Sequence, residues 1–170
     1  MNKQTTVTVK PAKILFVCLG NICRSPAAEG VMKKFARQTE GGLAGGLQLE
    51  VDSAGTAGYH IGELPDSRMR AHAFKRGYNL QHHARQFDPS FDFEKFDRVI
   101  AMDKSNLRNL QMMDRKGQYR NKLSLMTDYC QKIKVNEVPD PYYEGPEGFE
   151  YVLDILEDAC RGLLEELRQQ

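Results

Sequence analysis

The chain has 170 residues, enough for one compact domain but too few for two comfortable ones. Its 24 lysine and arginine residues nearly balance 23 aspartate and glutamate residues, and a net charge of +1 argues against a nucleic-acid groove or a general membrane-binding surface. There is no apolar run of about 18 residues, so no membrane-spanning helix is expected. Any affinity for anions must therefore come from a local site.

Residues 1–12 are polar, contain a proline and show no hydrophobic period, which predicts a flexible N-terminal tail. This segment also lacks the apolar stretch and cleavage site of a signal peptide. Four cysteines in a chain of this length do not make a disulfide scaffold, so we expect a reducing compartment and a cytoplasmic protein. Residues 13–170 are expected to form one domain.

The first predicted elements are a strand and a helix joined by a short turn. Residues 13–18 form an unbroken apolar run, which is typical of a strand buried on both faces of a parallel sheet. Ser25, followed by proline, predicts a helix start with Ser25 as the cap and Glu29 in the first turn. Apolar side chains at helical spacing over 28–35 predict one buried face. The glycine-rich stretch 41–46 predicts a flexible loop.

Strands and helices then alternate along the rest of the chain. Strands are expected at 47–53, 97–102 and 123–126, and helices at 67–77 with Ser67 as the cap, at 104–112 and at 149–167. The last helix carries a continuous apolar stripe. This alternation predicts a single α/β domain whose four-stranded parallel sheet is covered by helices on both faces. Ligands of such sheets bind beyond the carboxyl ends of the strands, which points to the turn after the first strand.

That turn contains a cysteine, an arginine six positions later, and a serine that leads into the helix. It reads Cys18-Leu19-Gly20-Asn21-Ile22-Cys23-Arg24-Ser25. A loop that runs into a helix N-terminus directs backbone N–H groups at one point, where the helix dipole favours negative charge. The planar guanidinium of Arg24 can hold two phosphate oxygens at once, and Gly20 lets the backbone turn. The segment therefore predicts a phosphate-binding loop.

The same surroundings favour the thiolate form of Cys18. A cysteine at a helix N-terminus beside an arginine ionises more readily than a free one, so we expect Cys18 to attack phosphorus as a thiolate. The hydroxyl of Ser25 is placed to donate to that thiolate. Packing alone would explain a lone buried cysteine, but it does not explain the whole segment between a buried strand and a helix start.

These eight residues, with Val17 before and Pro26 after them, resemble the signature loop of the low-molecular-weight protein tyrosine phosphatases. Three further segments occur in the family's order: Val51-Asp52-Ser53-Ala54-Gly55-Thr56, Ala101-Met102-Asp103 and Asp140-Pro141-Tyr142-Tyr143. The resemblance covers about residues 13–167 and implies a flavodoxin-like, doubly wound fold. It also implies hydrolysis of phosphotyrosine in tyrosine-phosphorylated proteins through a cysteinyl-phosphate intermediate, with no metal and no other cofactor.

The resemblance assigns roles to residues outside the loop. Asp140, between two prolines that stiffen the backbone, matches the family's general acid, which protonates the leaving phenol. Tyr142 and Tyr143 match side chains that flank a slot for an aromatic ring, and Tyr59 matches a further wall residue. Related proteins that resemble arginine phosphatases tend to carry threonine at the position of Ile22. The apolar side chain of Ile22 suits an aryl substrate better. Without the resemblance, a surface Asp-Pro turn and two packing tyrosines would be an adequate interpretation.

Asn21, Ser53 and His82 match a hydrogen-bond network that holds the family's loop in a strained turn. A solvated pair of His82 with its neighbour His83 remains an alternative. Asp103 is a family position too, although a role as a helix cap is an adequate account of it. The resemblance places phosphate or sulfate among the loop residues Leu19, Gly20, Asn21, Ile22, Cys23 and Ser25, with Cys18 and Arg24.

The remaining cysteines have different interpretations. Cys23 either fills the loop or, as we favour, captures oxidised Cys18 as a disulfide. Cys160 lies on the apolar stripe of the last helix and is assigned to the core, whereas Cys130 has no explanation. No cysteine pair has the spacing of a zinc site, so no metal is expected.

Two other functions are weighed against the phosphatase. An arsenate reductase uses a similar loop but relays electrons through further cysteines, for which Cys130 and Cys160 have no evident placement. A phosphotyrosine-binding module without catalysis would lack Cys18 or Asp140, and the chain has both.

Overall fold

The computed structural model describes residues 11–38 and 48–170, so the first ten residues of the predicted tail at 1–12 and the glycine-rich loop at 41–46 lie outside the described residues. Four strands form one parallel sheet in the order β2-β1-β3-β4. They are β1 (Ala12–Cys18), β2 (Leu49–Gly55), β3 (Arg98–Ala101) and β4 (Leu123–Leu125). The predicted four-stranded parallel sheet is confirmed. The tail boundary is off by one residue, because Ala12 already pairs with Leu49 in the sheet.

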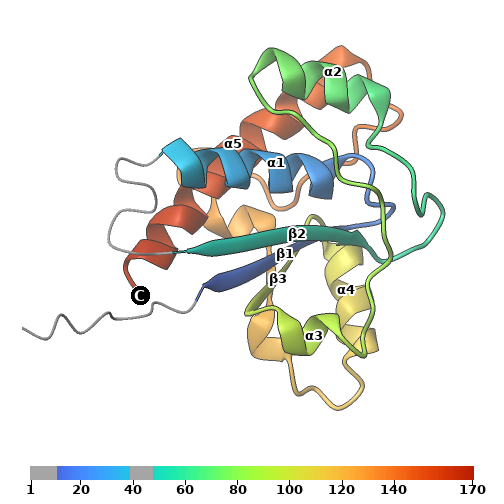
Figure 1. Ribbon diagram of the computed structural model, residues 1–170, viewed down its shortest axis with the longest axis vertical. Coiled ribbons are helices and arrows are strands. Elements are labelled where there is room, and N and C mark those ends of the chain that lie inside the picture. The colour runs from blue at the N-terminus through green and yellow to red at the C-terminus, as the bar shows by residue number, and fades with distance from the viewer. Residues whose placement is uncertain (1–10, 39–47) are drawn as a thin grey trace, which may run out of the picture.

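Helices cover both faces of this sheet, as Figure 1 shows. One face carries α1 (Arg24–Gln38), α2 (Ser67–Lys75) and α5 (Pro146–Arg168), and the other carries α3 (Asp92–Lys95) and α4 (Lys104–Met113). Two short 3₁₀ turns, η1 (Arg120–Lys122) and η2 (Met126–Tyr129), flank β4. The chain is a single α/β domain of the doubly wound type that the sequence predicts.

The central position of β1 in the sheet explains why its residues are apolar. Ile14 and Phe16 are fully buried against α1, α2 and α5, whereas Leu15 and Val17 are fully buried on the side of α3 and α4. Because successive side chains of a strand point to opposite faces, a strand covered on both sides needs apolar residues at every position. This position also fixes the site, because β1 lies where the strand order reverses, and ligands of such sheets bind there.

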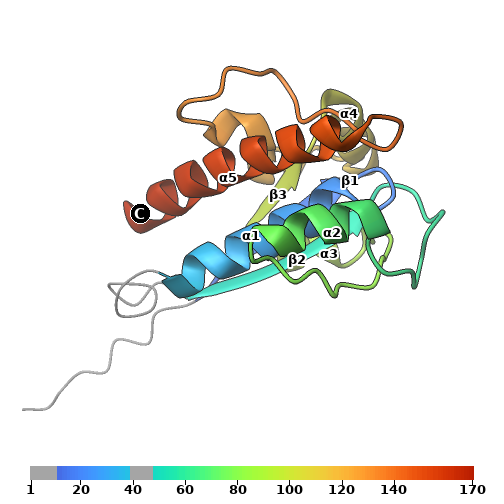
Figure 2. The same cartoon turned by 90° about the horizontal axis from the view of Figure 1, so that it is seen from above.

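The apolar stripe predicted for the last helix is confirmed. Every member of the stripe is buried in α5: Phe149, Val152, Leu153, Leu156, Cys160, Leu163, Leu164 and Leu167. Figures 1 and 2 show α5 running beside α1, and the Cys160 sulfur lies 3.9 Å from the Ala28 carbonyl oxygen of α1. Cys160 is therefore a core residue, as predicted.

Several predicted helix ends are wrong in detail. Asp66, not Ser67, caps α2, and its carboxylate accepts the backbone N–H groups of Arg68 and Met69 at 2.8 and 3.4 Å. This helix ends at Lys75, before Gly77, whose φ of 87° is outside the helical range.

The start of α1 also differs from the prediction. The helix begins at Arg24, so Ser25 lies inside it rather than at its cap, and Glu29 is not in the first turn. The hydroxyl of Ser25 is used in the site instead, as described below. The helix α3 and the turns η1 and η2 were not predicted, because three or four residues are too few to show a hydrophobic period.

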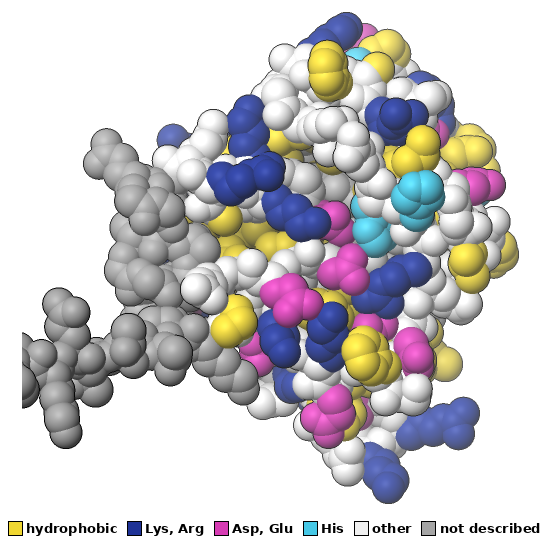
Figure 3. Space-filling model, in the orientation of Figure 1, with side chains coloured by type: hydrophobic (Ala, Val, Ile, Leu, Met, Phe, Trp, Pro, Cys, Tyr) yellow, Lys and Arg dark blue, Asp and Glu magenta, His cyan; other side chains and the backbone are white. Residues whose placement is uncertain are grey.

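The charge on the surface is mixed, as the composition indicates. Figure 3 shows lysine and arginine side chains gathered over α1, with acidic side chains interspersed on the same face. Across the described ranges 11–38 and 48–170, no helix combines the length and the apolarity needed to cross a membrane.

Candidate functional site

The predicted phosphate-binding loop, residues 18–25, joins the carboxyl end of β1 to the start of α1. Two backbone hydrogen bonds tie it to the end of β2: Thr56 donates to the Cys18 carbonyl and Ala57 to the Leu19 carbonyl, both at 2.9 Å. Gly55 permits this approach, since a Cβ there would lie 2.7 Å from the Leu19 carbonyl oxygen. The neighbouring strand therefore holds the first half of the loop.

The turn of the loop depends on Asn21 rather than on Gly20. Asn21 has a φ of 57°, in the left-handed region that asparagine tolerates better than most residues, whereas Gly20 has an ordinary negative or extended φ. Gly20 is small for another reason, because a Cβ there would lie 3.0 Å from the Cδ2 atom of His60. The strained turn predicted for Asn21 is present.

The side chain of Asn21 has a hydrogen-bond partner at every polar position. Its Oδ1 accepts the backbone N–H of Arg85 at 2.9 Å, and because that group can only donate, the orientation of the amide is fixed. The Nδ2 group must then donate to the hydroxyls of Ser25 at 2.8 Å and Ser53 at 3.0 Å. Asn21 is 1 % exposed, so this network is shielded from water.

The orientation of the amide decides where the Ser25 proton points. The Ser25 oxygen accepts from Asn21, so its own hydrogen donates elsewhere. The Cys18 sulfur lies 3.0 Å away and the Ala54 carbonyl oxygen 3.5 Å away, which makes the sulfur the nearer acceptor. Ser53 in turn donates to the Glu29 carboxylate at 3.0 Å. The predicted contact between Ser25 and Cys18 is therefore present, and it is backed by a chain of buried hydrogen bonds.

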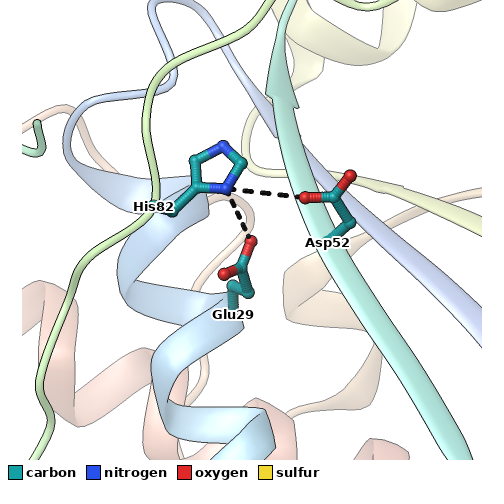
Figure 4. Close-up of side chains that lie close together, drawn as sticks. All are labelled: Glu29, Asp52 and His82. Carbon is teal, nitrogen blue, oxygen red and sulfur yellow. Dashed lines mark ion pairs between the residues drawn. The ribbon is translucent and has the colours of Figure 1, made fainter. Parts of the chain in front are cut away.

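His82 completes the network from a loop far along the chain. Its Nε2 lies 2.8 Å from Asn21 Oδ1, and its Nδ1 lies 3.3 Å from Glu29 and 3.5 Å from Asp52. Figure 4 shows the ring nitrogen facing the two carboxylates, one from α1 and one from β2. His82 is thus the member of the histidine pair that reaches the loop; His83 instead lies 3.1 Å from the Gly62 carbonyl oxygen.

The ligand atoms of Glu29, Asp52 and His82 lie within 4.8 Å of one another, a spacing that suits a metal ion. Both carboxylates already face cationic groups, because Glu29 pairs with Lys33 at 3.1 Å and Asp52 with Arg85 at 3.0 Å. Arg85 also pairs with the buried Asp92 at 2.9 Å, so carboxylates and cations alternate through the cluster, which acts as an ion-pair network behind the loop. From the sequence, Glu29 was given only a place in the helix and Arg85 no role, since nothing in the local pattern marks either residue as part of this network.

Arg24 is 3 % exposed and is held by three groups from distant parts of the chain. Its Nη1 donates to Asp103 at 2.6 Å and to the Val138 carbonyl at 3.1 Å, and its Nη2 lies 3.7 Å from Asp140. Burial by itself would lower the pKa of Arg24, but the Cys18 sulfur and Asp103 more than offset this and raise the pKa above its usual value. The guanidinium therefore stays charged.

Asp140 lies at the rim of the site, and its side chain is 45 % exposed. Its Oδ1 accepts the backbone N–H of Tyr142 at 3.0 Å, which leaves Oδ2 directed toward Arg24. One oxygen is thus used to shape the loop and the other faces the pocket. This arrangement suits a group that exchanges a proton with a ligand bound at the loop.

These residues enclose a pocket of about 290 Å³. Its floor contains Cys18, Cys23 and Arg24, and its lining also includes Leu19, Gly20, Ile22, Tyr59, His60, Asp140, Tyr142 and Tyr143. Tyr142 and Tyr143 pack edge to face with ring centroids 5.0 Å apart, and Tyr59 is 77 % exposed. The three predicted wall residues therefore line the same pocket as the loop. His60 was not predicted.

Arg68 is a further residue that the sequence did not indicate. It forms a two-point contact with Asp66, and its guanidinium lies 5.2 Å from the ring centroid of Tyr142 and 4.9 Å from that of Phe149. Cation–π contacts of this kind favour one orientation of the ring. Arg68 therefore supports the tyrosine wall from behind.

Cys18 and Cys23 are both present as free thiols and both are buried. Burial, and then the negative charges of Asp66 and of Cys18, raise the pKa of Cys23 far above its usual value, so Cys23 is a protonated thiol at neutral pH. The two cysteines therefore lie in one loop, but Cys23 is not suited to act as a thiolate nucleophile, the role expected of Cys18. The thiol of Cys130 is half-buried, and burial together with Asp158 raises its pKa to about 11.

Comparison with known proteins gives a consistent result over almost the whole chain. The sequence model for the low molecular weight phosphotyrosine protein phosphatases matches residues 13–170. A putative low molecular weight protein-tyrosine-phosphatase of Synechocystis is 52 % identical, with 93 % of this chain and 98 % of the relative covered. The human low molecular weight phosphotyrosine protein phosphatase is 39 % identical, with 89 % of this chain and 93 % of the relative covered.

The structural comparison agrees with the sequence comparison. A crystal structure of a protein tyrosine phosphatase from Entamoeba histolytica, with Hepes in its active site, superposes with a TM-score of 0.86 at 47 % identity. The match covers 93 % of this chain and 97 % of that one. The resemblance stated from the sequence motifs therefore holds for the entire fold, and the chain belongs to the low molecular weight phosphotyrosine protein phosphatase family.

Proposed function

We propose that the chain hydrolyses phosphotyrosine in proteins through a phosphoryl group carried on Cys18. The observation that supports this most strongly is the convergence of Cys18, a Ser25 hydroxyl directed at its sulfur, and the buried charge of Arg24 on one small pocket. A nucleophile, a donor that stabilises it and a cation for the phosphoryl oxygens are the parts that this chemistry needs.

In the first step, the Cys18 thiolate attacks phosphorus in line with the bond to the phenol oxygen. Arg24 and the backbone N–H groups of the loop stabilise the charge on the transferring phosphoryl oxygens. The P–O bond breaks as the S–P bond forms, and Asp140 gives its proton to the departing phenol oxygen. The tyrosine wall holds the aromatic ring, and Tyr142 is itself held by Arg68.

In the second step, water attacks the phosphorus of the cysteinyl-phosphate. Asp140, now a carboxylate, accepts a proton from that water, and the S–P bond breaks to return the thiolate. The Ser25 hydroxyl donates to the sulfur, which makes it a better leaving group. Inorganic phosphate leaves the loop and Asp140 is again protonated for the next cycle.

The positions of the other cysteines favour this function over an arsenate reductase. Cys160 is fully buried on the inner face of α5, and Cys130 packs against the core beside Asp158. Neither lines the pocket of Cys18 and Cys23. A thiol relay would need a third cysteine within reach of the loop, so we favour hydrolysis. We also propose a cytoplasmic location, on the ground that four cysteines in a chain of this length do not make a disulfide scaffold.

A trapping experiment tests the proposal. The protein is mixed with a ³²P-labelled phosphotyrosine peptide, quenched in acid and digested, and the label is expected on the peptide that contains Cys18. Cys18→Ser should give no turnover and no label but should still bind inorganic phosphate, because Arg24 and the loop remain. Cys130→Ser is the matched control and should behave as the unmodified protein does. Substantial hydrolysis by Cys18→Ser would overturn the covalent mechanism.

A further inference from the structure

A second groove continues from the catalytic pocket along the surface. It has a volume of about 760 Å³ and shares Leu19 and Tyr59 with the pocket. From there it runs over the residues that follow β2 and past Pro89 toward the end of α4, where Met112 and Arg115 line it. Because Leu19 and Tyr59 line both hollows, the two hollows adjoin, and a ligand anchored at the loop that passes these two side chains reaches the groove.

The groove carries apolar side chains that the fold itself does not use. Met112 is 74 % exposed and Tyr59 is 77 % exposed, whereas Leu110, two residues earlier on α4 and so on its opposite side, is fully buried. Exposed apolar side chains that gather beside a binding site mark a surface for a partner, and methionine adapts to irregular partners because its side chain is flexible. The apolar wall therefore suits a polypeptide with at least one apolar side chain.

The far end of the groove is basic. Arg115 is exposed and forms no ion pair with any residue in the ranges 11–38 and 48–170. The adjacent Asp114 forms no ion pair with it, and its two oxygens instead accept the backbone N–H groups of Gln118 and Tyr119 at 3.0 Å each. Asp88, next to Pro89, is engaged with Ser90. The positive charge of Arg115 is therefore available to a partner.

The floor of the groove holds a buried polar atom without a partner. The Thr56 hydroxyl is the one buried side-chain oxygen or nitrogen in the described ranges that makes no hydrogen bond, and Thr56 is 7 % exposed. Its backbone is committed to the loop, because its N–H donates to the Cys18 carbonyl at 2.9 Å. Unsatisfied buried hydroxyls are uncommon, and this one belongs to a residue that lines the groove, where the backbone of a bound peptide would offer it a partner.

We propose that this groove binds the segment of a protein substrate next to its phosphotyrosine, and that it selects an apolar side chain followed by an acidic one. The proposal rests on the proposed function and adds a substrate class to it. An extended peptide advances about 3.3 Å per residue with side chains alternating in direction, which allows one to contact Met112 while another reaches Arg115. The phosphate binds at the loop, and the groove binds the residues beside the phosphotyrosine and selects among them.

The test compares peptides that differ in one charge. Two phosphotyrosine peptides are made with the same apolar flanks on both sides, one with glutamates and one with lysines beyond them, and 4-nitrophenyl phosphate serves as a substrate with no flank. We expect Arg115→Glu to raise KM for the glutamate peptide by ~2–5-fold, the size of an exposed ion pair, and to lower KM for the lysine peptide. The effect should shrink at high ionic strength.

Lys116→Glu is the matched control, because it makes the same change in net charge on the neighbouring exposed residue, which does not line the groove. Equal effects of Arg115→Glu and Lys116→Glu would show only long-range attraction and overturn the proposal. Met112→Ser should raise KM for both peptides and leave 4-nitrophenyl phosphate unchanged, with Phe74→Ser, exposed on α2 away from the groove, as its control.

The two proposals fail in different ways. One outcome is that the unmodified protein hydrolyses 4-nitrophenyl phosphate and also both peptides, with the same KM for the glutamate peptide as for the lysine peptide. In that case the groove is not a substrate surface, although the phosphatase function stands. If the unmodified protein hydrolyses none of the three, both the proposed function and the groove are overturned.

Discussion

Asp103 binds Arg24 through one carboxylate oxygen and caps α4 through the other. Oδ2 accepts from Arg24 Nη1 at 2.6 Å, and Oδ1 accepts the backbone N–H of Asn106 at 2.7 Å. The Asn106 side chain returns a contact to the backbone of Asp103 at 3.2 Å, which completes a capping box. From the sequence, Asp103 was given as a family position or as a helix cap. The structure confirms the cap and adds the contact with Arg24, which was not predicted.

This double use predicts that the two roles of Asp103 can be separated. Asparagine is as good a cap as aspartate, so Asp103→Asn should keep α4 intact while it removes the charge opposite Arg24. A hydrogen bond to a charged group is worth ~1.5–3 kcal/mol, so we expect kcat/KM for an aryl phosphate to fall by about 10–100-fold. Steady-state kinetics and urea unfolding, measured on the same preparation, check the result.

Asp114→Ala is the control for this experiment. Asp114 follows the other end of α4 and holds two backbone N–H groups there, but it does not contact Arg24. It should lower the free energy of unfolding by about 1–3 kcal/mol and leave kcat/KM close to that of the unmodified protein. Equal kinetic losses in both variants would mean that Asp103 acts only through the stability of α4.

The sequence predicts the parts of this site that are local in the chain. The 18–25 loop is one continuous segment with a buried strand before it and a helix after it, so residue types and order are enough to suggest its chemistry. The contacts that hold the loop are not local. Glu29 lies 24 residues from Ser53, and Arg68 lies 74 residues from Tyr142, and no pattern near either residue reveals the partner.

The fold shows the same division. The sheet strands and the longer helices were predicted from the pattern of apolar residues. That pattern is continuous in β1, which is buried on both faces, and forms one stripe in α5. The errors lie at ends and in short turns. Ser67 was the expected cap of α2, but Asp66 lies one residue earlier with a charged acceptor, and both residue types cap helices well, so composition could not choose between them.

Oxidation should link Cys18 to Cys23. Peroxide oxidises the Cys18 thiolate to a sulfenic acid, and Cys23 then displaces the hydroxyl group, which leaves as water while the S–S bond forms. Burial raises the pKa of Cys23, so this second step should become faster as the pH rises through the accessible range. Peptide mapping of the oxidised protein should find the linked pair, and a thiol reductant should restore activity.

The variant Cys23→Ser tests whether Cys23 protects Cys18 from irreversible oxidation or only fills space in the loop. Without Cys23, the sulfenic acid of Cys18 has no thiol nearby and proceeds to the sulfinic acid, so inactivation by peroxide should become irreversible. Cys130→Ser, remote from the loop, should recover as fully as the unmodified protein. Full recovery of Cys23→Ser after reduction would mean that Cys23 only fills space in the loop.

Asp158 should make stability depend on pH. It is buried in α5 and accepts the backbone N–H groups of Lys132 and Ile133 at 3.0 and 2.8 Å. Burial raises its pKa, but these bonds outweigh burial and hold the pKa below its ordinary value. The stabilisation is therefore full above the unfolded value of about 3.9 and is lost as the pH falls through the folded value.

Urea unfolding of Asp158→Asn at several pH values measures this contribution. At pH 7 the variant should be less stable by ~1.5–3 kcal/mol, and the difference should narrow below pH ~4 as the native carboxylate becomes protonated. Asp154→Asn on the exposed side of the same helix, where Asp154 pairs with Arg76 at 2.9 Å, should cost no more than ~1 kcal/mol. A difference between Asp158→Asn and the unmodified protein that does not change with pH would contradict the assignment.

The role of Asp140 is best tested by varying the leaving group. Tyrosine phosphate releases a phenol of pKa about 10, which needs a proton as its bond to phosphorus breaks, whereas a strongly acidic phenol leaves well without one. General acid catalysis is typically worth about 10²–10⁴-fold, so Asp140→Asn should lose rate on that order for phosphotyrosine and clearly less for an activated aryl ester. The measurement is kcat across a series of aryl phosphates.

Asparagine is the right substitution because its side-chain oxygen can still accept the Tyr142 N–H, which Asp140 binds at 3.0 Å. The backbone between Pro139 and Pro141 should therefore keep its shape, and only the proton on the oxygen that faces Arg24 is lost. A steeper dependence of log kcat on leaving-group pKa is the signature of a missing acid. A uniform loss across the series would instead assign Asp140 a structural role, with its charge acting on Arg24, and the acid would have to be another group at the rim of the pocket.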